Sequence, residues 1–253
     1  HIVEVRPKRV NGEATSLVQR EEVVFRRPAG DEIARFMRTT VTRPRAEDKA
    51  APAPKAPPLS REELDRIAAC YDAEPGRRRG PRRWGKGEVV AGEALGPLVK
   101  GPLSVTNLVG WAIGWGSPLC PTNRLLRQWC EAYPDSTVEN GRTGWREGPE
   151  GIHWDPDVYQ AFGYDRGFDF GPQRISWMAH LCTDWCGDDG FLKELDVRLL
   201  KPDFIGDVTW LTGRVTAVAQ AAGADRVELV LEGRNQHDEL TTTARAVLDL
   251  PTD

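Results

Sequence analysis

The sequence of 253 residues has little of what marks several common protein classes. It contains five cysteines, four histidines and two methionines. No apolar run approaches the roughly 18 residues that span a bilayer, and no signal-peptide pattern is present. Gly-x-Ser-x-Gly, phosphate-loop and dinucleotide-binding motifs are also absent. We therefore expect no membrane segment and none of the functions that these motifs indicate.

The five cysteines are an odd number at irregular spacing: Cys70, Cys120, Cys130, Cys182 and Cys186. This spacing argues against a disulfide framework and predicts a cytoplasmic location, where thiols stay reduced. Cys182 and Cys186 lie four residues apart, on one face of a predicted helix. A structural metal site would need a second ligand pair at matching spacing, so the sequence favours buried thiols and predicts no metal.

Charge is nearly balanced, with 34 Lys and Arg against 38 Asp and Glu. A net charge of −4 does not indicate nucleic acid or an anionic membrane as a partner. Residues 76–87 (GRRRGPRRWGKG) are locally basic. We favour a solvated loop for them, and the alternative is a phosphate contact through guanidinium groups.

The first third of the chain predicts a hairpin, a linker and a helix. Residues 13–27 and 32–43 are rich in Val, Phe, Thr and Ile on either side of a turn, which indicates a long β-hairpin. Residues 44–59 contain five prolines and predict an extended linker. The Ser60 to Glu63 capping box predicts a helix that ends at about Tyr71.

A second domain is expected from Glu88 onward. Residues 88–95 predict a strand, and Ser104 or Thr106 would cap a short apolar helix at 107–115. The irregular stretch 116–150 predicts a long loop that covers a site. Four long strands are predicted at 191–200, 207–219, 226–235 and 239–250.

Between these parts lies a stretch that predicts two helices. Asp155-Pro156 is a typical helix start, followed by a short helix at 156–162. The main helix is expected at 172–186, closed by Gly187, with one apolar stripe formed by Ile175, Met178, Leu181, Cys182 and Trp185. An apolar helix followed by long antiparallel strands predicts an α+β fold in which a curved sheet wraps the helix.

Several motifs together resemble a known family: Ile152-His153-Trp154-Asp155-Pro156, Gly163, Phe168-Asp169-Phe170-Gly171, Arg174, Trp177 and the run 199–210. Residues 84–250 resemble a MaoC-type hot-dog domain, and residues 1–43 resemble the strands of a FAS1-like dehydratase hot-dog domain. The resemblance implies a double hot dog with an incomplete N-terminal copy. The expected domains are 1–43, a linker with a short helix at 44–83, and 84–253.

The resemblance implies an acyl-thioester hydro-lyase, which hydrates an enoyl-CoA or dehydrates a 3-hydroxyacyl-CoA. Coenzyme A would enter as part of the substrate, without a separate cofactor. His153 matches the family's acid/base. The family's Asp stands five residues before that His, where this chain has Gly148, and Glu147 or Glu150 is the candidate replacement.

The resemblance also implies a thioester-binding region at the start of the main helix. Gly171, Gln173 and Arg174 match it, with Trp177 as core or tunnel wall. Pro172 lacks an N–H and cannot donate a hydrogen bond to the thioester oxygen. Free amides at a helix N-terminus would supply that donor.

Two other functions stay open. The missing Asp favours a non-catalytic subunit that binds acyl-CoA or completes a partner's site, and the fold also accommodates thioesterases. Since hot-dog domains usually pair, we expect a homodimer or a heterodimer with another hot-dog chain. Outside these motifs, His180 and Asp184 lie four apart on the main helix, as a base and its orienting group or, more simply, as a helical side-chain contact.

Overall fold

The structure is a computed structural model that describes residues 1–10, 13–42, 58–120, 123–220 and 223–251. The chain divides into two compact units. One comprises residues 1–49 with 161–163, and the other comprises 50–160 with 164–253.

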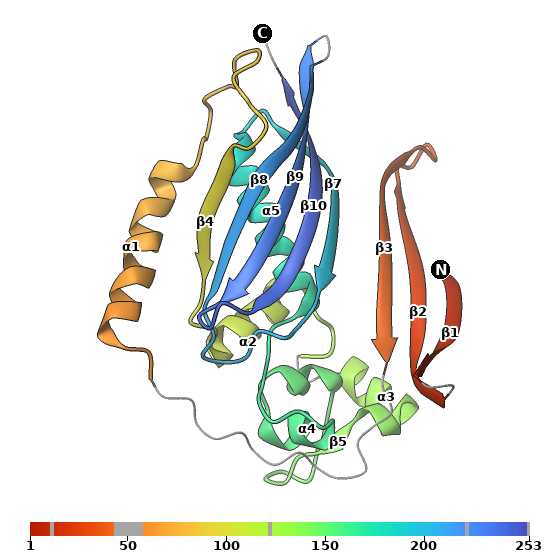
Figure 1. Cartoon of the computed structure of the whole chain (residues 1–253). Helices are drawn as coiled ribbons and strands as arrows, with labels where there is room; N and C mark the ends of the chain where they lie inside the picture. The colour runs from red at the N-terminus through yellow and green to blue at the C-terminus, as the bar shows by residue number, and fades with distance from the viewer. Residues whose placement is uncertain (11–12, 43–57, 121–122, 221–222, 252–253) are drawn as a thin grey trace. The chain divides into compact units, whose positions relative to one another are not determined.

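The N-terminal unit is a three-stranded antiparallel sheet in the order β1-β2-β3 (Figure 1). Its strands are β1 (Ile2–Val10), β2 (Glu13–Arg26) and β3 (Glu32–Thr42). The β2–β3 pairing confirms the predicted hairpin. Strand β1 was not predicted. It contains Pro7 and lies at a sheet edge, where a residue without an N–H is tolerated. Within residues 1–10 and 13–42, which the structure describes, the chain forms no helix.

The second unit contains a five-stranded antiparallel sheet that packs on one long helix (Figure 1). The strand order is β4-β8-β9-β10-β7. Helix α5 (Gly171–Cys186) packs against the inner face of this sheet. The predicted α+β hot-dog architecture is therefore present. The strands are β4 (Ala94–Lys100), β7 (Phe191–Leu199), β8 (Thr209–Gln220), β9 (Ala224–Asn235) and β10 (Leu240–Pro251).

The core of this unit lies between α5 and the sheet. Met178, Leu181 and Cys182 of the predicted stripe are buried there. On β9, the buried residues alternate with outward ones, as the period-two pattern predicted. The residues of the sheet that face α5 in this core include Val227, Leu229, Leu231, Ala246, Leu248 and Leu250. Burial raises the pKa of the Cys182 thiol to about 12 and that of Cys186 to about 11, as expected for inert thiols.

The strand predicted at 88–95 is wrong in most of its length. β4 begins only at Ala94; residues 88–90 have no regular structure and residues 91–92 form a turn. Glu88 accepts a hydrogen bond from the Gly85 amide, which closes the turn before this segment. The apolar character of this segment reflects burial of Val89, a single anchoring residue.

Helix α1 (Arg61–Arg77) begins at the predicted capping box but runs past the predicted end at Tyr71. It continues through Pro75, which removes one intrahelical hydrogen bond. Within this extension, Arg77 Nη1 donates to the carbonyl of Pro97 on β4 at 2.9 Å. Earlier in the helix, Ile67 is buried against Val99 of β4, and the Tyr71 hydroxyl donates to the Gly101 carbonyl at 2.7 Å. Tertiary packing therefore overrides the local helix-stop signal.

The segment 116–150 is more ordered than the predicted loop. It contains helix α3 (Arg124–Ala132), whose N-cap Asn123 accepts from the Leu126 amide. Short strands β5 (Val138–Glu139) and β6 (Arg146–Glu147) follow. Helices α2 (Val105–Gly114), capped by Ser104, and α4 (Pro156–Ala161) confirm the predicted caps and starts.

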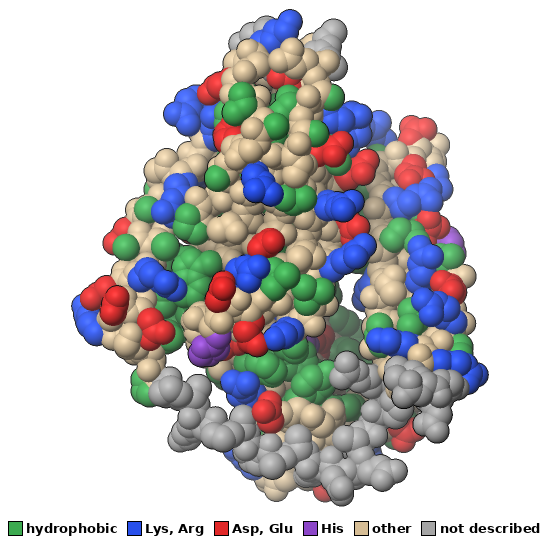
Figure 2. All heavy atoms as spheres, viewed as in Figure 1, with side chains coloured by type: hydrophobic (Ala, Val, Ile, Leu, Met, Phe, Trp, Pro, Cys, Tyr) green, Lys and Arg blue, Asp and Glu red, His purple; other side chains and the backbone are tan. Residues whose placement is uncertain are grey.

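Charges of both signs are interspersed on the visible face of the second unit (Figure 2). On the outward side of the sheet, Glu194, Asp196 and Glu228 lie near Arg245. Within the described residues, no helix is both long and apolar enough to span a membrane.

Candidate active site

His153 closes the short 3-10 helix Pro149–His153, just before α4. Its imidazole packs against two aromatic rings, with centroid separations of 3.6 Å to Phe170 and 4.9 Å to Phe168. Nδ1 lies 2.9 Å from the Phe168 carbonyl oxygen. A carbonyl can only accept a hydrogen bond, so Nδ1 carries the hydrogen and Nε2 of the neutral ring holds the lone pair.

The surroundings of His153 keep this ring neutral. Burial lowers the pKa of His153 from 6.5 to about 4, and hydrogen bonds to backbone groups of Phe168 and Asp169 oppose the shift only partly. At neutral pH the imidazole is therefore a proton acceptor through Nε2. Its proton affinity is low unless a nearby negative charge develops.

The backbone around Phe168 is held by the segment 203–205. The Asp169 amide donates to the Asp203 carbonyl, and the Ile205 amide donates to the Gly167 carbonyl, each at 2.9 Å. A Cβ at Gly167 would lie 2.4 Å from the His153 carbonyl oxygen. Only glycine permits this approach, so Gly167 fixes where the His153 backbone lies.

The same contacts place His153 at the N-terminal end of α5. Phe170, on which the imidazole packs, is the N-cap of α5. The first amides of a helix have no intrahelical acceptor, and Gly171 and Gln173 supply them here because Pro172 has none. The Gln173 side chain is buried and its Oε1 accepts from the Phe170 amide at 3.4 Å. The structure thus brings together His153, Gly171 and Gln173 of the predicted site.

Arg174 is at the same end of α5 but points into a buried ionic cluster. It is 2% exposed, and Nε lies 2.7 Å from Asp169 Oδ2 and 3.2 Å from Asp203 Oδ2. Nη2 pairs with Asp169 Oδ1, and Nη1 donates to the carbonyls of Lys201 and Thr241. All three nitrogens have protein partners, so the geometry favours a structural role over the thioester contact that the resemblance implies.

Two buried carboxylates share that one guanidinium. Burial raises the pKa of Asp203 to about 6, with Arg174 acting against the shift and Asp169 adding to it. Burial also raises the pKa of Asp169, although Arg174 opposes this. In the sequence, Asp169 and the run 199–210 are only part of the resemblance. In the structure, Arg174 connects Asp169, at the start of α5, to Asp203 in the loop before β8 and to the Thr241 carbonyl on β10.

Trp177 lies one turn further along α5, half-buried between two apolar clusters. One cluster is the core between α5 and the sheet, and the other contains Leu103, Leu108 and Phe170. Trp177 packs against both clusters, and its predicted role as core or tunnel wall stays a prediction. Direct contact with substrate remains a prediction.

Gly148, where the family that the sequence resembles has Asp, is buried. A Cβ there would lie 2.8 Å from Leu126 Cδ1 and 3.3 Å from the Leu119 carbonyl oxygen. Leu126 belongs to α3 and is itself buried. Leucine therefore occupies the space into which a carboxylate at position 148 would project.

The two candidate replacement carboxylates bind elsewhere. Glu150 accepts a hydrogen bond from the Ser117 hydroxyl. Glu147 accepts one from the Asn140 amide at 3.1 Å. In the described part of the chain, no hydrogen bond or ion pair joins either carboxylate to His153. Their catalytic role remains a prediction.

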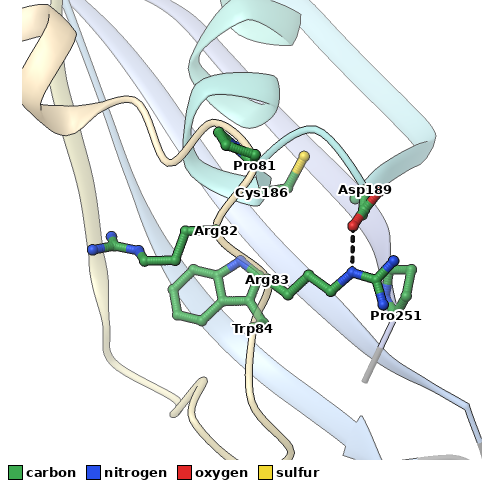
Figure 3. Close-up of a pocket in the computed structure, with 8 residues that line it drawn as sticks. Pro81, Arg82, Arg83, Trp84, Cys186, Asp189 and Pro251 are labelled. Carbon is green, nitrogen blue, oxygen red and sulfur yellow. Dashed lines mark hydrogen bonds and ion pairs between the residues drawn. The ribbon is translucent and has the colours of Figure 1, made fainter. Parts of the chain in front are cut away.

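The arginine-rich segment is largely used in contacts within the chain. Arg79 packs over the Trp84 ring at 3.2 Å and pairs with Glu88. Figure 3 shows Arg83 directed at Asp189, with Nε 2.6 Å from Oδ2. Trp84 and Cys186 line the same small pocket. The segment therefore anchors to the C-terminal end of α5, a role that neither the solvated-loop nor the phosphate interpretation anticipated.

The chain is similar to known proteins in its fold. No protein-family model and no curated protein matches the sequence. A solved structure of a MaoC-like dehydratase aligns with 100% of this chain and 68% of its own, at 14% identity and a TM-score of 0.61. The chain thus has the hot-dog fold of that MaoC-like dehydratase, and the predicted resemblance is confirmed at the level of fold.

Two further solved structures each cover about two thirds of this chain. The (R)-hydratase from A. caviae involved in PHA biosynthesis has 16% identity, covers 65% of this chain and 99% of its own, and has a TM-score of 0.47. The ChsH1-ChsH2 complex from Mycobacterium tuberculosis has 22% identity, with 64% and 98% covered and a TM-score of 0.45.

Proposed function

We propose that the protein is an acyl-thioester hydro-lyase that hydrates an enoyl-CoA, or dehydrates a 3-hydroxyacyl-CoA, with His153 as the acid/base. One observation carries the proposal. The neutral imidazole of His153 packs on Phe170, the residue that starts α5, while its Nδ1 is held by the Phe168 carbonyl. Nε2 is left as the proton acceptor beside a helix N-terminus.

This arrangement supplies the two groups that hydration needs. Nε2 of His153 takes a proton from water as the water oxygen forms a bond to C3 of the enoyl thioester. The electron pair of the C2–C3 double bond moves toward the thioester oxygen. When the thioester carbonyl re-forms, C2 takes the proton held on Nε2, which returns His153 to its neutral form. The amides of Gly171 and Gln173 are the donors for the oxygen's developing negative charge. Dehydration follows the same steps in reverse.

The test measures turnover of trans-2-enoyl-CoA substrates of several chain lengths. Turnover is monitored as the loss of absorbance of the conjugated enoyl thioester. His153→Gln is expected to lower kcat/KM by roughly 10²–10⁴, the usual value of a positioned acid/base. His237→Gln, an exposed histidine in the β9–β10 turn, is the matched control. Unchanged turnover in His153→Gln, with the fold intact by circular dichroism, would exclude the proposal.

A non-catalytic acyl-CoA-binding subunit is the second candidate, and the packing at Gly148 favours it. Leu126 fills the space where the family's carboxylate would lie, and Glu147 and Glu150 are bonded elsewhere. In this case the chain alone would bind acyl-CoA without turnover. Turnover would appear on adding a different hot-dog chain that forms a heterodimer with it.

Glu150→Gln and Glu147→Gln separate the two candidates. If the chain is catalytic by itself and uses one of these carboxylates, that variant loses turnover while the other retains it. Release of free thiol from a saturated acyl-CoA would instead indicate a thioesterase.

A further inference from the structure

Three ionisable side chains converge at the C-terminal half of α5, away from His153. His180 Nε2 lies 3.2 Å from Asp184 Oδ2 and 3.9 Å from Glu74 Oε1. Their ligand atoms all lie within 4.8 Å of one another. Among the residues that the structure describes, no other three His, Cys, Asp or Glu side chains come this close.

The convergence is tertiary rather than a local helical contact. His180 and Asp184 are on α5, whereas Glu74 is on α1, which packs beside β4 (Figure 1). Lys100 at the end of β4 has Nζ 2.8 Å from His180 Nδ1. An ammonium can only donate, so Nδ1 accepts from Lys100 and Nε2 carries the ring hydrogen that faces the two carboxylates. A metal at Nε2 takes the place of this hydrogen, and its binding therefore releases a proton.

The geometry is close to that of a transition-metal site. Tetrahedral Zn²⁺ with bonds of about 2.1 Å places its ligand atoms about 3.4 Å apart. The distances of 3.2 and 3.9 Å bracket this value. One imidazole and two carboxylates are ligands that Zn²⁺ and Co²⁺ accept, while Mg²⁺ and Ca²⁺ prefer oxygen alone.

The cluster also has access to solvent. It lines a cleft of about 750 Å³ whose other walls include Tyr71, Arg78 and Thr183. The exposed fractions of the side chains are 36% for His180, 29% for Glu74 and 18% for Asp184. A metal with three protein ligands would keep a fourth position open toward this cleft, as catalytic zinc sites do.

We propose that Glu74, His180 and Asp184 bind a divalent transition-metal ion of the zinc class in this cleft. The sequence predicted no metal because Cys182 and Cys186 lack a second ligand pair at matching spacing. Glu74 lies 106 residues before His180, so no local spacing connects these two residues. Gly171 and Asp184 are about 20 Å apart along the axis of α5 at 1.5 Å per residue. The proposed metal site therefore does not depend on the proposed hydro-lyase.

The test is a titration of the full chain with Zn²⁺ by calorimetry and with Co²⁺ by visible absorption. We expect one saturable site with the d–d spectrum of four-coordinate Co²⁺. Glu74→Gln, His180→Gln and Asp184→Asn preserve side-chain shape and should each weaken binding at least about 100-fold, since even outer-shell changes cost 10–100-fold. Excess Mg²⁺ should leave the Co²⁺ spectrum unchanged.

Two controls make the result specific. Asp188→Asn removes a carboxylate from the same cleft, one that pairs with Arg78, and His237→Gln removes an exposed imidazole elsewhere. Both should bind Zn²⁺ and Co²⁺ as the unmodified chain does. Absence of saturable binding, or binding that survives His180→Gln in a chain that circular dichroism shows to be folded, would overturn the proposal.

Discussion

The two ends of α5 use ionisable residues in opposite ways. At the N-terminal end, Arg174 and Asp169 are almost fully buried and all three guanidinium nitrogens have partners. At the C-terminal half, His180 and Asp184 are partly exposed beside an open cleft. Buried charges must be satisfied by the protein itself, whereas exposed ones stay available to a ligand. The comparison separates residues that hold the fold from residues that can bind.

The largest expected effect is at Arg174. Arg174→Met would leave Asp169 and Asp203 buried without the guanidinium that faces both. We expect the free energy of unfolding to fall by about 3–5 kcal/mol at neutral pH, as for other broken buried pairs. Urea denaturation measures it, with Arg226→Met, from a surface pair with Asp249, as a control of little effect. Similar losses in both variants would contradict the structural role of Arg174.

Gly167→Ala should have the next largest effect. Its Cβ would meet the His153 carbonyl oxygen at 2.4 Å and Ile205 Cδ1 at 2.7 Å. Overpacking of this kind typically costs about 1–3 kcal/mol, and here it should also shift the imidazole resonances of His153. Gly110→Ala in α2 is the control because nothing lies within 4 Å of its Cβ position. The prediction fails if the His153 resonances are the same in both variants.

The pH dependence of stability tests the N-terminal end further. The pKa of His153 is about 4 in the fold and 6.5 unperturbed, so its contribution is present above pH 6.5 and is lost as pH falls toward 4. Asp203, with its pKa raised to about 6, acts oppositely, and its contribution is lost as pH rises from 4 to 6. His153→Gln removes the His153 trend and leaves those of Asp203 and the other carboxyl groups.

The measurement is urea denaturation of the unmodified chain and His153→Gln between pH 4 and 7. The stability difference between them should change by about 1–2 kcal/mol in favour of the unmodified chain as pH rises, after allowing for partial solvent screening. His237→Gln provides the reference slope. A direct NMR titration that returns an unshifted pKa for His153 would refute its burial.

The smallest effect is expected at the C-terminal half of α5. Without metal, Asp184→Asn and His180→Gln should change the free energy of unfolding by no more than about 1 kcal/mol, because partly exposed ion pairs contribute little. Thermal melts in the presence of a chelator measure this. A loss as large as that of Arg174→Met would mean that the cluster holds the fold and would erase the contrast between the two ends.

Local sequence signals predicted many of the elements correctly. The caps at Ser60 and Ser104, the Asp155-Pro156 start and the period-two pattern of β9 all confirm their predictions. The end of α1, the start of β4 and the existence of α3 were missed. In α1, a local stop signal at Pro75 was overridden by packing on β4. Propensity alone does not contain that information.

The candidate site, too, was predicted only in part from the sequence. The motif placed His153 and Gly171 in one site, and the structure brings both to the start of α5. No local pattern indicated that Arg174 would pair with Asp169 and Asp203 in the interior. None indicated that Leu126 would fill the space beside Gly148. These contacts join elements that are separate in the sequence.

The sequence by itself determined most of the long helices and strands and the apolar face of α5, because those properties repeat over neighbouring residues. It also determined which residues resemble a hydro-lyase site. Tertiary structure alone decided which charged groups are paired in the interior and which face the cleft. It brought Glu74 of α1 to His180 of α5, and burial gave His153 its low pKa. Solvent access and long-range contact depend on how the elements pack, so no local pattern encodes them.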